Sequence, residues 1–439
     1  MIPGLEHVLH LACVICGATY GVEDAGYVCP DHGNEGILDV RYDYEHIGAS
    51  FSPATLLETG DATMWRYRPL LPVRADDTVP PLTVGGTPLY DVPRLAAELA
   101  LDRVWVKDEG RQPTASLKDR ASAMAIVKAR AAGAAIVTTA STGNAAAALS
   151  GLSASLGQRN VIFVPATAPE AKIAQLLAYG STVVLVDGTY GDAFELCMEA
   201  AAEYGWYNRN TGYNPYMTEG KKTAMLEILE QLDWEPPDVV LVSVGDGSII
   251  GGLHKGVKDA LALGWISRAP RIIGVQAAGS DYMVQAFEND EDVLTKPPIV
   301  ADTVADSISA DLPRDRIKAM AAVTETGGAY LRVSDDEIFA AIPTLARGSG
   351  VFAEPAGAAA YAGLVVAVDR GLVASGERAV VLSTGSGLKD VASAMRAVSA
   401  IGTEPIRITP DLDALKQALD ARHRSALDMR SRGALDARH

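Results

Sequence analysis

Short apolar runs alternate with alanine-rich stretches along most of the chain, and this alternation limits the possible folds more than any other feature. The apolar runs are rich in β-branched residues and lie at 104–106, 135–137, 161–164, 183–186, 239–242, 272–275 and 379–382. Stretches of helical length separate several of them, at 119–132, 144–156, 169–178, 191–203 and 219–232. Strands separated by helices predict doubly wound parallel sheets in an α/β protein.

The positions of the polar loops predict two sheets rather than one. Loops rich in Gly, Ser and Thr fall in two groups, one at 112–144 and the other at 243–252 together with 383–390. We therefore predict two doubly wound parallel-sheet domains with a binding cleft between them. The predicted parts are an N-terminal ribbon-like segment at 1–48, a large domain joining 50–118 with 216–405, a small domain at 119–215 and a polar helical tail at 406–439.

Composition excludes several functional classes. Among the 439 residues, 38 Lys and Arg stand against 55 Asp and Glu, and the formal net charge is −17. An acidic chain repels phosphate backbones, so we expect no nucleic-acid partner. The sequence has neither a run of about 18 apolar residues nor a basic start followed by an apolar core, so we expect no membrane partner and a cytoplasmic location. A local pocket can still be positive enough to bind an anionic small substrate.

The N-terminal segment contains a pattern of metal-binding residue types. Cys13 and Cys16 form one pair, Cys29 and His32 form another, and twelve residues separate the pairs. Two such pairs suit tetrahedral zinc, and four protein ligands would make the site structural. The alternatives are a ribbon that has lost its metal, or reduced thiols that pack against the main domain. We expect the fourth cysteine, Cys197, to be a buried apolar residue and not a ligand.

A lysine follows a proline-bearing loop in the segment 112–120. Pro113 ends an extended stretch, and Ser116 is positioned to cap a helix that begins near Lys118. The positive end of the helix dipole favours the neutral amine of a lysine placed there, which is the form that Schiff-base chemistry needs. The alternative for Lys118 alone is an ordinary solvated lysine.

A second loop, Ser141-Thr142-Gly143-Asn144, lies between a predicted strand and an alanine-rich helix. Such a loop at the carboxyl end of a strand is typical of a binding site. Asn144 can bond a ring hydroxyl or a substrate carboxylate with help from the backbone amides of the helix start. The alternative is a plain helix cap.

Two further loops complete the pattern of candidate binding segments. The glycines of Gly245-Asp246-Gly247-Ser248 allow backbone amides to approach a single phosphate closely, although an ordinary strand-to-helix turn is the alternative. The spacing matches neither a dinucleotide fingerprint nor a P-loop. In the segment 383–390, a hydroxyl side chain can face a ring nitrogen, or it can cap a turn.

Together the loops describe a phosphate, a hydroxylated nitrogen ring and a lysine, and this combination resembles the fold-type II pyridoxal-phosphate enzymes (tryptophan synthase β-like). Within them the chain is most similar to the threonine synthase family. The matching segments occur in the family's order, at 85–89, 106–110, 113–120, 141–144, 214–215 with 219–220, 354–358 and 384–390. Threonine synthases read P-T-G-S-F-K-D-R around the lysine, whereas this chain has Ala115 and Leu117 at two of these positions. The N-terminal cysteines also resemble those of some threonine synthases and cysteate synthases.

The resemblance implies a role for each candidate residue. Lys118 would hold pyridoxal 5′-phosphate as a Schiff base and act as the catalytic group. The implied cofactor-binding residues are Asn144 at the ring hydroxyl, Gly245, Asp246, Gly247 and Ser248 at the phosphate, and Thr384 at the ring nitrogen. The implied substrate-binding residues are Ser141, Thr142 and Gly143, which would receive the substrate carboxylate. The cofactor would lie in the cleft between the two domains, and the protein would be a homodimer.

The implied activity is that of a lyase that converts O-phospho-L-homoserine and water into L-threonine and phosphate. The alternative is replacement or elimination at the β-carbon of a serine-derived amino acid, as in cysteate synthase with O-phosphoserine and sulfite. Threonine synthases usually carry Arg in the segment N-P-x-R-x-E-G, and here the segment 214–220 has none. The candidates to replace that Arg are Lys172, Lys221 and Lys222.

Overall fold

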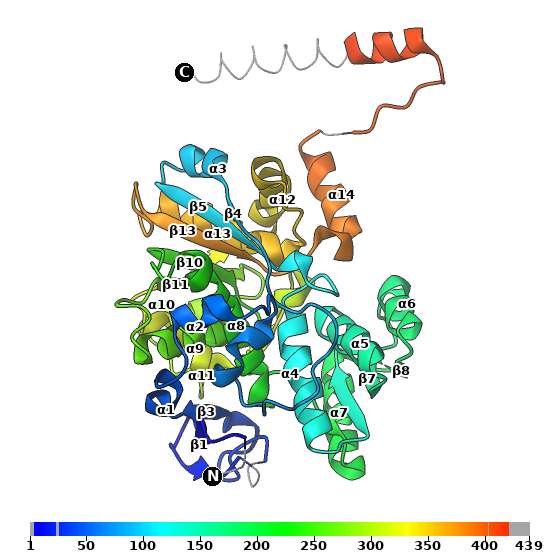
Figure 1. Cartoon of the computed structure of the whole chain (residues 1–439). Helices are drawn as coiled ribbons and strands as arrows, with labels where there is room; N and C mark the ends of the chain where they lie inside the picture. The colour runs from blue at the N-terminus through cyan, green and yellow to red at the C-terminus, as the bar shows by residue number, and fades with distance from the viewer. Residues whose placement is uncertain (1–3, 23–25, 403, 421–439) are drawn as a thin grey trace. The chain divides into compact units, whose positions relative to one another are not determined.

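The computed structural model describes residues 4–22, 26–402 and 404–420 (Figure 1). The described residues up to Ala394 belong to one compact unit, which holds three sheets. The other described residues belong to a second unit, in which 412–420 are helical, and 421–439 of the predicted tail lie outside the described residues. Among the helices of the described ranges, none is long and apolar enough to cross a membrane.

The largest sheet has six strands in the order β12-β11-β10-β13-β5-β4. The strands are β4 (Leu89–Asp91), β5 (Arg103–Asp108), β10 (Val239–Ser243), β11 (Arg271–Ala277), β12 (Ala329–Val333) and β13 (Arg378–Ser383). Neighbours run parallel except β4, which pairs antiparallel with β5. All residues of β10 are buried, as expected for a strand in the middle of a parallel sheet that is covered on both faces.

Seven α-helices of the described chain lie in the segments that precede or connect these strands. They are α3 (Pro93–Glu98), α8 (Tyr216–Gln231), α9 (Ser248–Ala262), α10 (Tyr282–Glu288), α11 (Arg316–Thr324), α12 (Asp335–Ser349) and α13 (Pro355–Asp369). Short 3₁₀ turns lie at η3 (Glu109–Arg111), η4 (Asp306–Ile308) and η5 (Gly387–Lys389), and α14 (Val391–Ala400) follows the last of them. Helix α8 packs against α9 and against α4 (Lys118–Ala131).

The second sheet has four parallel strands in the order β8-β7-β6-β9. The strands are β6 (Ile136–Ala140), β7 (Arg159–Pro165), β8 (Thr182–Val186) and β9 (Tyr207–Asn208). The helices that precede or connect them are α4 (Lys118–Ala131), α5 (Asn144–Leu156), α6 (Glu170–Ala178) and α7 (Tyr190–Tyr204). The two parallel sheets confirm the predicted α/β class, and the exact domain boundaries stay a prediction.

The N-terminal segment forms a small antiparallel sheet in the order β2-β1-β3. Its elements are β1 (Val8–Cys13), β2 (Thr19–Tyr20), η1 (Gly33–Glu35), β3 (Leu38–Tyr42) and α1 (Tyr44–Gly48). The predicted connection that follows contains two short helical turns, α2 (Pro53–Glu58) and η2 (Met64–Leu70). Buried residues of this ribbon, including Leu11 and Val40, share one apolar cluster with the buried face of α4, so the ribbon packs on the main body.

Candidate active site

Loops from both parallel sheets line one cavity of about 1250 Å³. The cavity lies at the carboxyl ends of β6 and β10, where binding sites of parallel α/β sheets form. Nine of the residues predicted from the sequence line it: Lys118, Ser141, Thr142, Gly143, Asn144, Gly245, Asp246, Gly247 and Ser248. The structure thus brings together three loops, and the first and last of them are more than one hundred residues apart in the sequence.

Thr384 does not line this cavity, although it lies close to the lysine loop. It is buried, and its backbone carbonyl accepts a hydrogen bond of 2.9 Å from the amide of Leu117. The next residue, Gly385, forms a β-bridge with Ser116. These contacts hold the loop before Lys118 in place, and the role of the Thr384 hydroxyl toward a ring nitrogen stays a prediction.

Lys118 is the first residue of α4, as the sequence predicted. Burial, together with the nearby positive charge of Arg209, lowers the pKa of Lys118 to about 8. The expected cap by Ser116 was wrong: the N-cap residue is Leu117, and the buried hydroxyl of Ser116 has no hydrogen-bond partner. The neutral amine is therefore favoured mainly by burial and by neighbouring charge.

The two residues after Lys118 fix the start of α4. Asp119 accepts hydrogen bonds from the backbone amide and the hydroxyl of Thr114, which closes the loop before the lysine. Arg120 is fully buried and pairs with Glu109 at 2.8 Å and with Glu227 at 2.7 Å. Because Glu109 follows β5 and Glu227 lies on α8, one arginine joins three elements around the lysine.

Lys107 completes this buried ion cluster, which we define as Lys107, Glu109, Arg120 and Glu227. Its amine lies 2.8 Å from Glu227. Burial alone lowers the pKa of Arg120, but the carboxylates of Glu109 and Glu227 outweigh it, so the pKa is raised above its usual value. Two cations and two carboxylates thus compensate one another inside the protein.

The glycine loop of residues 245–248 leads from β10 into α9. Gly247 has φ of +88°, a conformation that favours glycine, and no side chain caps the helix that begins at Ser248. The first amides of α9 are therefore free to bind an anion. The amine of Lys221 lies 2.7 Å from the hydroxyl of Ser248 and adds positive charge beside this helix start.

Lys221 and Arg209 are buried cations without a carboxylate partner among the described residues. Burial lowers the pKa of Lys221 well below its usual value, and the charges of Lys118 and Arg209 lower it further. Burial also lowers the pKa of Arg209 to about 10. The Nη2 atom of Arg209 is buried without a hydrogen-bond partner, while Nε and Nη1 donate to Ser122 and Thr211 at 3.1 Å each.

The lining of the cavity is positive although the whole chain is acidic. Six basic side chains line it, against four acidic ones. The basic residues are Lys118, Lys172, Arg209, Lys221, Arg314 and Lys389. This excess of positive charge, together with the unpaired cations, suits a ligand that carries phosphate.

Of the three lysines considered as replacements for the missing arginine, two reach the cavity. Lys172 lines it and pairs with Asp306 at 2.7 Å near the surface, and Lys221 lines it beside the glycine loop. Lys222 points elsewhere, because its amine lies 2.6 Å from both Glu219 and Asp259 in a separate buried ion network. Arg209, which the sequence reasoning missed, is a further candidate.

Asn144 connects the two halves of the site. It begins α5, and its amide donates a hydrogen bond of 2.7 Å to Glu354, which precedes α13. Burial raises the pKa of Glu354 to about 7. The alternative of a plain helix cap by Asn144 is excluded, because the N-cap residue is Gly143 and no side chain caps α5.

The residues present fit a cofactor that carries a phosphate and reacts with an amine. Two uncapped helix starts, those of α5 and α9, face a single cavity with a buried lysine of lowered pKa. Two buried polar atoms of the lining, Nη2 of Arg209 and Oγ of Ser243, have no hydrogen-bond partner. Unpaired buried groups of this kind mark positions where a ligand completes the hydrogen bonding.

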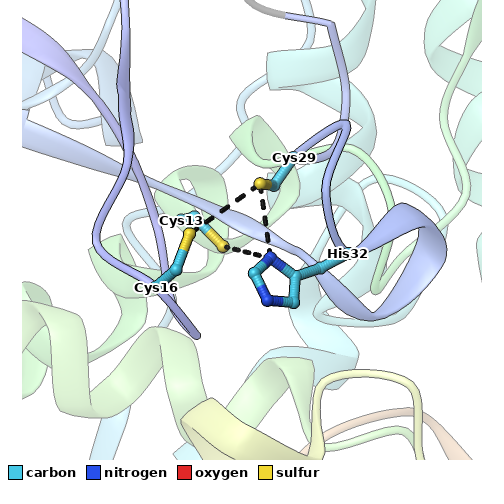
Figure 2. Close-up of side chains that lie close together, drawn as sticks. All are labelled: Cys13, Cys16, Cys29 and His32. Carbon is cyan, nitrogen blue, oxygen red and sulfur yellow. Dashed lines mark hydrogen bonds between the residues drawn. The ribbon is translucent and has the colours of Figure 1, made fainter.

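The predicted metal ligands come together in the N-terminal ribbon. The three sulfur atoms of Cys13, Cys16 and Cys29 and a ring nitrogen of His32 lie within 4.8 Å of one another (Figure 2). Cys197 lies outside this cluster and is buried in α7, as expected.

Comparisons with known proteins agree with this geometry. Residues 81–385 match the family model described as pyridoxal-phosphate dependent enzyme. The chain is 37% identical over 409 residues to the threonine synthase of Methanocaldococcus jannaschii, covering 93% of this chain and 98% of that protein. It is 36% identical over 341 residues to the threonine synthase of Mycobacterium leprae, covering 77% of this chain and 92% of that protein.

Solved structures share the fold at lower identity. Threonine deaminase isoform 2 from Solanum lycopersicum superposes with a TM-score of 0.62 at 23% identity, over 72% of this chain and 88% of that one. Diaminopropionate ammonia lyase from Escherichia coli superposes with a TM-score of 0.60 at 19% identity, over 71% of this chain and 87% of that one. These likenesses confirm the predicted fold type.

Proposed function

The chain belongs to the threonine synthase family of pyridoxal-phosphate dependent enzymes, and from this membership we propose that it converts O-phospho-L-homoserine and water into L-threonine and phosphate. The unpaired guanidinium nitrogen of Arg209 carries the substrate assignment. A phosphorylated amino acid brings a second phosphate in addition to that of the cofactor, and Arg209 supplies a buried fork of donors for it.

Pyridoxal phosphate, when bound, supplies an electron-withdrawing ring that stabilises negative charge on the α-carbon of an amino acid. Lys118 would hold its reactive carbon, and the glycine loop 245–248 with Lys221 would hold its phosphate. Asn144 and Thr384 would hold its ring. This assignment is supported by the uncapped start of α9 and by the contact between Lys221 and Ser248.

Lys118 has the properties of a general base. With a pKa near 8, a sizeable fraction of its amine is neutral around neutral pH, so Nζ can remove a proton from the substrate and return it. Its position is fixed by Asp119 and Arg120, which limits motion of the amine between proton transfers. We propose that this one amine serves the α- and β-carbons of the substrate in turn.

The remaining lining residues orient the substrate. The amides of Ser141, Thr142 and Gly143 precede the uncapped start of α5 and would receive its carboxylate. Arg209 would receive its phosphate, which is the leaving group of the reaction. The family's missing arginine is thus replaced from the end of β9 and not from the start of α8.

The test is to supply cofactor-loaded protein with O-phospho-L-homoserine and to quantify threonine and phosphate in the same reaction. We expect equal amounts of the two products. The control reaction contains O-phosphoserine and sulfite, for which we expect no turnover, because the relatives described above are threonine synthases and do not favour the serine-derived alternative. Turnover of the control without threonine formation would overturn the proposal.

We also propose that the protein is a homodimer in the cytoplasm. Light scattering of the purified chain tests the first statement, and a mass of one chain would overturn it. Fractionation of the cells that produce the protein tests the second.

A further inference from the structure

The ribbon places four metal-ligating side chains around one point. Cys13 is the last residue of β1, Cys16 lies in the loop between β1 and β2, and Cys29 and His32 come from the loop before η1. Figure 2 shows the three sulfur atoms and the Nδ1 atom of His32 directed toward one another. Cys29 and Cys13 are buried, whereas Cys16 is exposed, so a bound ion would be held at the edge of the ribbon.

The distances within the cluster match a tetrahedral ion. Zinc–sulfur bonds of about 2.3 Å and zinc–nitrogen bonds of about 2.0 Å place sulfur atoms about 3.8 Å apart and sulfur and nitrogen about 3.5 Å apart in a tetrahedral site. The Sγ atoms of Cys16 and Cys29 are 4.0 Å apart, and Nδ1 of His32 lies 3.9 Å from Cys13 and 3.5 Å from Cys29. The cysteines form no disulfide.

The surroundings of the cluster support bound thiolates. The backbone amide of Ile15 donates to Cys13 at 3.4 Å, and the hydroxyl of Tyr20 lies 3.0 Å from the sulfur of Cys29. Donors of this kind orient and stabilise metal-bound sulfur. A side chain at Gly36 would lie 2.7 Å from Cβ of Cys29 and 2.8 Å from Cβ of His32, so the glycine lets these two ligands approach.

The ribbon is joined to α11 at two positions shortly after His32, Glu35 and Leu38. Glu35, three residues after His32, pairs with Arg316, the first residue of α11. The buried guanidinium of Arg316 also donates to the carbonyls of Val293 and Pro313, at 2.6 and 3.1 Å. From β3, the carbonyl of Leu38 accepts a hydrogen bond of 3.2 Å from Lys318.

Helix α11 in turn contacts the glycine loop. The amide of Asp315, just before α11, donates a hydrogen bond of 2.8 Å to the carbonyl of Asp246. A side chain at Gly247 would lie 2.7 Å from Cβ of Ala319, so the helix and the loop are in close contact. The segment from the cysteine cluster to the glycine loop is therefore a continuous series of direct contacts.

We propose that Cys13, Cys16, Cys29 and His32 bind one zinc ion, and that the zinc-bound ribbon holds α11 and, through it, the glycine loop 245–248. Three thiolates and one imidazole without carboxylates are ligands that select zinc over calcium or magnesium. All four positions are filled by protein, so the ion is structural. The second half of this proposal rests on the proposed function, in which the loop binds the phosphate of the cofactor.

The zinc half is tested by the metal content of the purified full-length protein. We expect about one zinc per chain in the wild type, and almost none in Cys16→Ser, which changes an exposed ligand. The matched control is Cys197→Ser, a cysteine outside the ribbon, which should retain the zinc. A chelator with a colorimetric indicator tests the wild type without substitution. A wild type that neither contains nor takes up zinc, or Cys16→Ser with full zinc, would overturn this half.

The coupling half is tested by titrating cofactor-free protein with pyridoxal phosphate and following its visible absorbance. We expect Kd to rise about fivefold in zinc-stripped protein and in Glu35→Gln, with zinc retained in the latter. Glu45→Gln, an exposed glutamate of α1, is the control and should match the wild type. Equal Kd values in the wild type, the zinc-stripped protein and the two variants would overturn the coupling. They would not affect the conclusion about zinc binding. A wild type that binds no cofactor contradicts the proposed function instead, because zinc content is measured separately.

Discussion

Two groups of buried cations in this protein differ in whether they have carboxylate partners. In the ion cluster behind α4, Arg120 and Lys107 each lie within 2.8 Å of a carboxylate. In the wall of the cavity, Arg209 and Lys221 are equally buried, yet neither forms an ion pair with any described residue. The pKa of Arg120 is raised by its partners, whereas burial lowers the pKa of Arg209 to about 10.

The difference separates structural charges from ligand-binding charges. A buried charge without a partner costs free energy, and a ligand that supplies the opposite charge offsets this cost. The paired cluster compensates its own charges within the folded chain, whereas in the proposed function the unpaired cations bind the phosphates of cofactor and substrate. Substitutions in the two groups should therefore affect different measurements.

The largest effect is expected from Lys118→Ala. Turnover should fall by about 10⁴-fold, equivalent to ~5 kcal/mol of barrier, because the general base is lost. The cofactor-free variant should be no less stable than the wild type at neutral pH, since a buried amine of lowered pKa has been removed. Threonine formation and urea unfolding measure the two quantities, and turnover at the wild-type rate would refute the role of Lys118.

Arg120→Leu should instead reduce stability. Removing this cation leaves Glu109 and Glu227 buried with too little positive charge, and the free energy of unfolding should fall by about 3–5 kcal/mol. The matched control is Arg271→Leu, which breaks a half-buried pair with Glu377 and should cost about 1 kcal/mol or less. Urea unfolding measures both losses. Similar losses in the two variants would show that the fully buried cluster contributes no more to stability than a half-buried ion pair.

Arg209→Met should change substrate binding and leave stability intact. The KM for O-phospho-L-homoserine should rise about 100-fold, equivalent to ~2.7 kcal/mol, because a charged fork of donors is lost. The Kd for pyridoxal phosphate should change little, since the glycine loop and Lys221 remain. Arg209→Lys should give an intermediate KM, because it keeps the charge without the fork. A rise in the cofactor Kd with an unchanged KM would move Arg209 to the cofactor phosphate.

The smallest effect concerns pH and uses cofactor-free protein. Lys118 has a pKa of about 8 when folded and near 10.5 when unfolded, so the unfolded chain binds more protons between these values. The stability of the wild type should therefore rise with pH through this window, relative to Lys118→Met. The variant should be the more stable protein below pH 8 and lose that advantage toward pH 10.5. Thermal melts of both proteins across the window measure the difference, and parallel curves would contradict the lowered pKa.

Much of the fold could be predicted because its signals are local. The apolar runs expected to be strands correspond to β5, β6, β7, β8, β10, β11 and β13, most of which are buried on both faces. Strands β4 and β9 were missed because they have only three and two residues. Strand β12 was missed because Arg332 interrupts its apolar residues.

The parts of the site that could be predicted are those in which the residues of a motif follow one another in the sequence. The lysine loop, the 141–144 loop and the glycine loop each carry their own signal. Arg209 has none, since it follows a two-residue strand, and only the fold shows that it is buried beside Lys221. Likewise the partners of Arg120 lie 11 and 107 residues away, so their pairing could not be read from spacing.

The position of Lys118 beside the buried ion pairs has a consequence for protein engineering. Lys118 and its anchor Arg120 are two residues apart on one helical turn, so the reactive amine cannot be moved without disturbing the most tightly paired charges. The 141–143 loop takes part in none of those ion pairs. Libraries that vary this loop alone can therefore search for new substrates while the ion pairs beside the lysine stay constant.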